Sequence, residues 1–120
     1  MLRTMSLCAA VIFTSLPTIT VAEQFKTITN KGDFVSLISG RQLTRQGIRL
    51  AVSPSGQIAG RGFGRDVSGG WTWREGFFCR DLFWGKRDLG FNCQMVKVNG
   101  STMRFISDRG TGQFADLKLR

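Results

Sequence analysis

The sequence predicts a mainly β fold, a small antiparallel β-barrel or sandwich of about seven strands with one N-terminal helix. From Leu43 onward, apolar residues recur at every second position, which is the period of a β-strand. Turn residues interrupt these runs at short intervals, so the strands are expected to pair as antiparallel neighbours. One apolar pattern of helical period precedes the strands, and we expect that helix to cover an open end of the barrel.

The start of the chain has the composition of an export signal. Arg3 supplies a positive charge, residues 7–16 are mostly apolar, and Thr20-Val21-Ala22 is a small-residue cleavage site. We therefore expect residues 1–22 to be a signal peptide and residues 23–120 to form a single β domain that is periplasmic or secreted. No later segment approaches the roughly 20 apolar residues of a membrane-spanning helix, so none is expected after cleavage.

The expected helix runs from Lys31 to Ser39, after an extended lead-in over residues 23–29. Asn30 can cap the start of the helix, and Asp33 stands three positions later, as in a capping box. Gly40 supplies the stop. The residues that share its apolar face, and so pack on the sheet, are Phe34, Leu37 and Ile38.

The strands are expected between turn signals. Turns are expected at Ser53-Pro54-Ser55-Gly56, Ser68-Gly69-Gly70, Asn99-Gly100 and Asp108 to Gly112. The alternating runs between them predict strands at Ile48 to Val52, Gln57 to Phe63, Trp71 to Arg74, Phe77 to Arg80, Leu89 to Met95, Thr102 to Ile106 and Phe114 to Leu119.

Two cysteines remain in the mature domain, because Cys8 leaves with the leader. In an oxidising compartment we expect Cys79 and Cys93 to form a disulfide between neighbouring strands. Both lie in runs that we interpret as inward-facing apolar residues, which suits a buried bridge. A redox or metal site needs closely spaced cysteines or histidine partners, and the chain has no histidine, so no metal site is expected.

The charge balance predicts an anionic partner. The chain carries a formal net charge of +9, which becomes +8 when Arg3 is removed with the leader. Arginine outnumbers lysine, and its planar guanidinium binds phosphate and carboxylate groups through two hydrogen bonds. An anionic envelope component or an acidic protein is the expected partner; nucleic acid is less accessible in the envelope. The alternative is a basic surface that only keeps the protein soluble.

Aromatic and basic residues are interleaved between residues 71 and 91. Trp84 adjoins Gly85-Lys86-Arg87 in an expected loop, and an exposed tryptophan beside basic residues is typical of interaction sites. The alternative is a half-buried tryptophan at a strand end. The predicted binding residues are Trp84, Lys86, Arg87, Arg74 and Arg80.

No cofactor and no catalytic residue are expected. Gly60-Arg61-Gly62-Phe63-Gly64 lacks the spacing of the dinucleotide fingerprint, and no helical pattern follows it. Its glycines suit tightly curved strands in a small barrel. Most of the acidic residues stand beside arginine or lysine, and without histidine the serines lack their usual base. The sequence therefore favours binding over catalysis.

Three segments carry a resemblance to known proteins: Gly70-Trp71-Thr72-Trp73, Gly76-Phe77-Phe78-Cys79-Arg80 and Asn92-Cys93-Gln94. From about Phe34 to its C-terminus the chain resembles a family of small exported alphaproteobacterial proteins, whose members are often named dihydrodipicolinate reductase. That name implies an NAD(P)H-dependent reductase. The arrangement is also similar, more loosely, to small secreted β-barrels that inhibit lysozymes or proteases. We favour a periplasmic non-enzymatic binding protein, with the hydrolase inhibitor and the reductase as alternatives.

Overall fold

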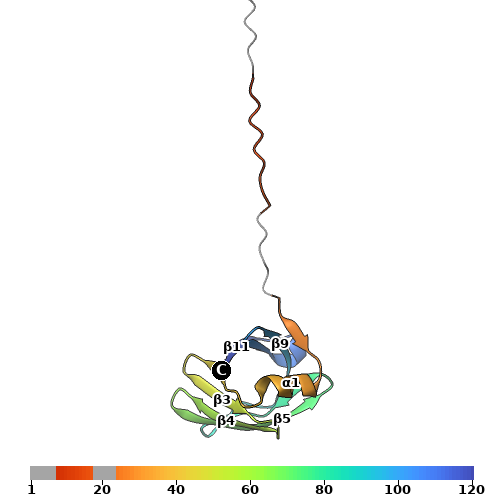
Figure 1. Ribbon diagram of the computed structural model, residues 1–120. Helices are drawn as coiled ribbons and strands as arrows, with labels where there is room; N and C mark the ends of the chain where they lie inside the picture. Colours follow the sequence, from red (N-terminus) through yellow and green to blue (C-terminus); the bar gives the residue numbers. More distant parts are fainter. Residues whose placement is uncertain (1–7, 18–23) are drawn as a thin grey trace, which may run out of the picture.

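The strands close into a ring in the computed structural model, which describes residues 8–17 and 24–120 (Figure 1). The eight strands of the ring are β2 Leu43–Arg45, β3 Ile48–Val52, β4 Gln57–Gly62, β5 Arg65–Arg74, β6 Phe77–Arg80, β9 Asn92–Asn99, β10 Thr102–Ile106 and β11 Phe114–Leu119. All neighbours are antiparallel, in the order β9, β10, β11, β2, β3, β4, β5, β6 and back to β9. The structure is therefore a closed β-barrel.

Three further strands extend the ring. β1, Lys26–Ile28, pairs with the C-terminal half of β9. β7, Phe83–Trp84, pairs with the N-terminal half of β5, and β8, Arg87–Asp88, pairs with β7. The chain after β6 thus leaves the ring as a β7–β8 hairpin before it returns as β9.

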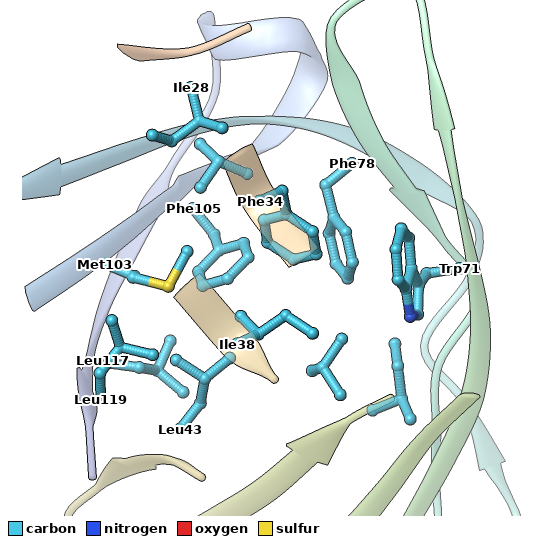
Figure 2. Packing of buried hydrophobic residues seen from close by; sticks show 13 residues of the cluster. Ile28, Phe34, Ile38, Leu43, Trp71, Phe78, Met103, Phe105, Leu117 and Leu119 are labelled. Atoms are coloured by element: carbon cyan, nitrogen blue, oxygen red, sulfur yellow. The ribbon is translucent and has the colours of Figure 1, made fainter. Parts of the chain in front are cut away.

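Helix α1, Lys31–Ile38, closes one end of the barrel (Figure 1). Asn30 caps it as expected: its Oδ1 accepts a hydrogen bond of 2.9 Å from the backbone N–H of Asp33. Phe34 and Ile38 are buried, and their side chains lie among the inward-facing core residues in Figure 2. The expected helix is confirmed to within one residue, and its apolar face fills the barrel end rather than packing on a flat sheet.

The two ends of the barrel differ. Consecutive strands form hairpins, so their turns alternate between the ends. The turns at residues 53–56 and 75–76 lie at the helix end, where Trp71 donates its indole N–H to the Ser53 carbonyl oxygen and its ring meets Phe34. The turns at residues 46–47 and 63–64 lie at the other end, which we call the open end.

The mainly β fold class with an N-terminal helix is confirmed, and the ring contains eight strands where about seven were expected. The additional strand is β2, whose three residues are too few to show a two-residue period. The prediction of a turn at Ser68-Gly69-Gly70 is wrong, because these residues lie inside β5 and the chain turns earlier, at Phe63 and Gly64.

Two glycines at inward positions allow strands to approach closely. A Cβ atom at Gly60 would overlap the carbonyl oxygen of Arg49, and one at Gly69 would overlap that of Asp81. No other residue type fits such contacts without moving the backbone. Gly60 belongs to the run whose glycines were expected to suit tightly curved strands, and the role that the structure shows for it is close contact between β4 and β3.

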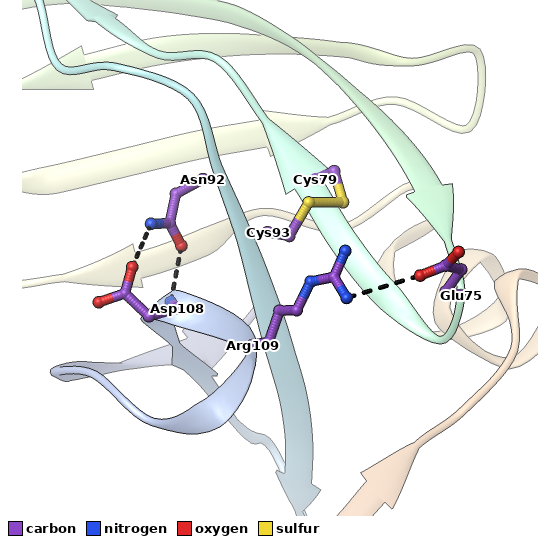
Figure 3. Close-up of a disulfide and its surroundings, with 6 residues drawn as sticks. All are labelled: Glu75, Cys79, Asn92, Cys93, Asp108 and Arg109. Atoms are coloured by element: carbon purple, nitrogen blue, oxygen red, sulfur yellow. Dashed lines mark hydrogen bonds and ion pairs between the residues drawn. A yellow bond between two sulfur atoms is a disulfide. The ribbon is translucent and has the colours of Figure 1, made fainter.

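The seam between β6 and β9 closes the ring through only three residue pairs. Cys79 and Cys93 are the middle pair and form a disulfide, as expected. The turn α2, Ser107–Gly110, packs against β9 and is fastened beside the disulfide (Figure 3). There Asn92 exchanges two hydrogen bonds with Asp108, of 2.8 and 2.9 Å, and Arg109 lies 3.6 Å from a Glu75 carboxylate oxygen.

The expected inward orientation of the cysteines is wrong. Phe78 and Val96 belong to the core cluster, and neither cysteine does. Because side chains alternate along a strand, Cys79 and Cys93 lie on the outer face of the barrel. Cys79 is nevertheless buried. The inward face could not be identified from the sequence because Phe77 and Phe78 are adjacent, so both faces of β6 carry an apolar residue.

The predicted leader lies largely outside the described residues. Of residues 1–22, the structure describes 8–17, which form no helix or strand, and the expected cleavage site at Thr20-Val21-Ala22 is not among them. Within the described ranges, no helix is both long and apolar enough to cross a membrane. The signal peptide stays a prediction.

Removing the seam disulfide is expected to destabilise the barrel. The double variant Cys79→Ser/Cys93→Ser should lose about 3 kcal/mol of unfolding free energy, because the unfolded chain gains the freedom of a roughly 15-residue loop. Urea unfolding of residues 23–120 measures this loss, and the oxidised wild type is the control. Equal midpoints for the double variant and the control would show that the seam does not need its disulfide.

A basic groove as the candidate functional site

A row of polar side chains crosses four strands on the outer face of the barrel. Lys118 on β11 pairs with Thr44 on β2, Thr44 pairs with Arg49 on β3, and Arg49 pairs with Arg61 on β4. Residues directly opposite one another in a sheet share a face, so these side chains stand side by side. Strands are about 4.8 Å apart, and the row therefore extends over roughly 14 Å.

The row lies in a groove of about 1030 Å³. The groove is deepest at Ala51 and Ala59, which pair with each other and carry small side chains on the outer face. No carboxylate lines it among the residues that the structure describes. The cations that line this basic groove are Arg45, Arg49, Arg61, Lys118 and Arg120.

The groove cations are only partly satisfied within the protein. Arg61 pairs with Asp66 at 2.8 Å, and Lys118 donates to the Thr102 hydroxyl at 2.6 Å. Arg49 forms no ion pair with any described carboxylate, and it stands directly opposite Arg61. Like charges at opposed positions of a sheet destabilise it. An anion bound between these two guanidinium groups would relieve the repulsion.

The nearby carboxylate of Asp116 is engaged elsewhere. Arg104 donates two hydrogen bonds to it, at 2.8 and 2.9 Å, on the outer face of β10 and β11. These hydrogen bonds are the main cause that holds the pKa of Asp116 below its usual value, and the charges of Arg45 and Lys118 lower the pKa further. Asp116 therefore stays ionised at neutral pH without closing the groove.

The arrangement suits anion binding more than catalysis. Guanidinium groups bind phosphate, sulfate or carboxylate oxygens through pairs of charge-assisted hydrogen bonds. Within residues 8–17 and 24–120, no three His, Cys, Asp or Glu side chains come close enough to hold a metal ion. Gly60–Gly64 runs into strand β5, whereas the dinucleotide fingerprint runs into a helix.

The predicted binding residues do not form one patch. Trp84 lies at the end of β7 rather than in a loop; it is half-buried, and its indole N–H donates to the Gly62 carbonyl oxygen at 2.7 Å. The guanidinium carbon of Arg65 lies 4.6 Å from the centre of its ring. Lys86 and Arg87 are exposed on the β7–β8 hairpin.

The other two predicted residues lie elsewhere. Arg74 precedes the turn at the helix end, and the chain from residue 77 to residue 84 separates it from the β7–β8 turn by roughly 23 Å. Arg80 shares the inward face of β6 with Phe78, at the open end. Desolvation there lowers the pKa of its guanidinium, and the charge of Asp81 opposes that shift.

Sequence reasoning missed the groove although part of its signal was present. Arg49 and Arg61 occupy polar positions of two strands expected to be joined at residues 53–56, so a register in which Ala51 faces Ala59 places them opposite each other. Lys118 carries no comparable signal, since it meets Thr44 through a pairing of segments 74 residues apart in sequence.

Comparison with known proteins adds no identity: no protein-family model matches the chain, and no curated protein or solved structure is significantly similar to it. The family resemblance noted from the sequence therefore stays a prediction, and so does the reductase activity that its name implies.

Asp116→Asn is expected to lower stability in a pH-dependent way. The pKa of Asp116 is depressed in the folded state, so its ion pair contributes stability above the unfolded pKa of about 4, and this is lost as the pH falls through the folded value. At pH 7 the variant should lose about 0.5 kcal/mol, a small value because the carboxylate is 37% exposed. Urea unfolding of both proteins from pH 7 to pH 2 measures the difference. A difference that stays constant over this range would contradict the assignment.

Proposed function

We propose that the protein is a non-enzymatic binding protein whose basic groove holds an anionic polymer of the cell envelope. The observation that carries the proposal is the opposed pair Arg49 and Arg61 in a groove with five cations and no lining carboxylate among the described residues. A fold gains nothing from placing like charges opposite each other. A bound anion would offset the repulsion between the two guanidinium groups.

The shape of the groove favours a polymer over an acidic protein. Specific protein interfaces have an apolar core with aromatic residues. The apolar side chains that line the groove are Ile48, Ala51 and Ala59, and none of its described lining residues is aromatic. Cations spread along a row of roughly 14 Å match a chain of repeated negative charges instead.

The expected compartment is consistent with this partner. The disulfide between Cys79 and Cys93 fits an oxidising space, and the leader predicted at residues 1–22 would deliver the chain to one. These two features support a periplasmic or secreted location, which is part of the proposal. No observation specifically favours the hydrolase inhibitor or the reductase, which remain the alternatives.

The proposal predicts that charge in the groove matters more than charge elsewhere. Fluorescein-labelled dextran sulfate should bind with an affinity that falls as salt is raised, and neutral dextran should not bind. Arg49→Gln/Lys118→Gln should weaken binding about tenfold, since two charge-assisted contacts are lost. Fluorescence anisotropy between about 50 and 500 mM NaCl measures both effects.

The matched control is Lys86→Gln/Arg87→Gln, which removes the same charge from the β7–β8 hairpin. It should change the affinity less than about threefold. Equal losses for both pairs would mean that only net charge is sensed. A larger loss of affinity for the hairpin pair would indicate that the binding site lies at the residues predicted from the sequence. Either result would contradict the proposal that the groove is the binding site.

A further inference from the structure

The barrel interior is not filled at the open end. A hollow of about 210 Å³ opens there, beyond the core that α1 completes at the helix end. Its wall is almost entirely apolar, with Ile48 and Leu50 from β3, Phe78 from β6 and Leu82 from the segment after it. Three polar side chains line it as well: Arg45, Arg80 and Gln94.

A second hollow continues the first. It has about 320 Å³ and shares Ile48, Leu50 and Leu82 with the first, so the two are adjacent. The β7–β8 hairpin covers it with Trp84, and the loop that follows β8 adds Leu89. All the residues that line it are apolar or glycine. Volumes of this order are those of small-molecule sites.

Apolar side chains are also exposed around this opening. Phe63, in the β4–β5 turn, is 68% exposed, and Leu89 is 44% exposed. Both line the second hollow. An exposed apolar rim around an apolar hollow marks a place where apolar material binds.

Arg80 adds charge to this apolar site. Its Nη1 donates to the Gly90 carbonyl oxygen at 2.8 Å, and it forms no ion pair within 4.0 Å with any described carboxylate. The neighbouring Asp81 is turned away, since its Oδ1 accepts from the Gly70 backbone N–H at 2.6 Å. A half-buried cation beside apolar walls carries a desolvation cost that an anionic group would offset. Arg45 lines the same hollow.

We propose that the open end binds a single-chain anionic amphiphile, with its acyl chain in the two hollows and its head group against Arg80 and Arg45. This goes beyond the polymer-binding groove and does not depend on it, because Arg80 and Leu82 line the hollows and not the groove. The two surfaces lie on opposite sides of the same strands and meet at Arg45 and Ile48.

Laurate is a suitable probe, with octanoate as the shorter chain and dodecyltrimethylammonium as the cationic counterpart, all below their micellar concentrations. Titration calorimetry of the oxidised protein should give one laurate per chain and no comparable binding of the cation. Affinity should rise from octanoate to laurate by up to about fourfold for each added CH₂ group, because each is buried. Affinity that does not depend on chain length, or no binding, would overturn the proposal.

Variants locate the site. Arg80→Gln should weaken laurate binding at least about tenfold, whereas Arg80→Lys keeps the charge and should retain most of the affinity. Leu82→Trp should fill the hollow and abolish binding. Arg49→Gln/Lys118→Gln, in the groove, is the control and should leave laurate binding unchanged. Melting curves check that each variant folds. If Leu82→Trp does not fold, the two substitutions at Arg80 decide the outcome.

The result that would overturn this site is equal laurate affinity for the wild type and Arg80→Gln. Sedimentation velocity adds a second criterion. If the protein is a dimer that laurate does not dissociate, and Leu82→Trp makes it monomeric, then a second copy of the chain covers the open end and the amphiphile proposal fails. A groove that fails to bind dextran sulfate would leave the amphiphile site untouched.

Discussion

The barrel depends on one short seam, the three residue pairs through which β6 meets β9. Without them β5 and β6 would end an open sheet, and Phe78 would lose its place beside Phe34, whose ring centre is 5.1 Å away. The disulfide between Cys79 and Cys93 holds the middle of the seam from outside. The hydrogen bonds between Asn92 and Asp108 fasten α2 over the same strand (Figure 3). Closure of the ring therefore depends on one disulfide and a small number of hydrogen bonds.

Closure also decides what the surfaces can do. In a ring, strands β2 and β3 have one face toward the core and one toward solvent, so Arg49 points into the basic groove while Ile48 and Leu50 line the interior. A closed sheet fixes the spacing of Arg49 and Arg61 in spite of their repulsion, and this keeps the cations ready for an anion. Helix α1 fills only one end, and the other end keeps its hollows. Both proposed sites thus follow from the same architecture.

The sequence predicted what is local. Asn30 and Asp33 predicted the start of the helix, because capping involves residues three positions apart. The two-residue period of apolar residues predicted where the strands are. The inward faces of β6 and β9 were assigned wrongly, because Phe77 and Phe78 are adjacent and the period does not show which of them faces the core. Ser68-Gly69-Gly70 was taken for a turn because glycine has two uses, and here Gly69 permits close contact with Asp81. The groove needed the pairing of Lys118 with Thr44, which no local pattern contains.

Amide hydrogen exchange of the oxidised protein, followed by NMR, tests the closed ring most directly. A closed ring requires that amides paired between β6 and β9 exchange as slowly as those between β3 and β4, because both pairs of strands belong to one cooperative unit. The decisive amides lie in the segments Phe77–Arg80 and Asn92–Asn99. Fast exchange at the seam, with slow exchange in the β3–β4 hairpin, would contradict closure and leave an open sheet. The groove would then lose the rigid frame on which its charge spacing depends.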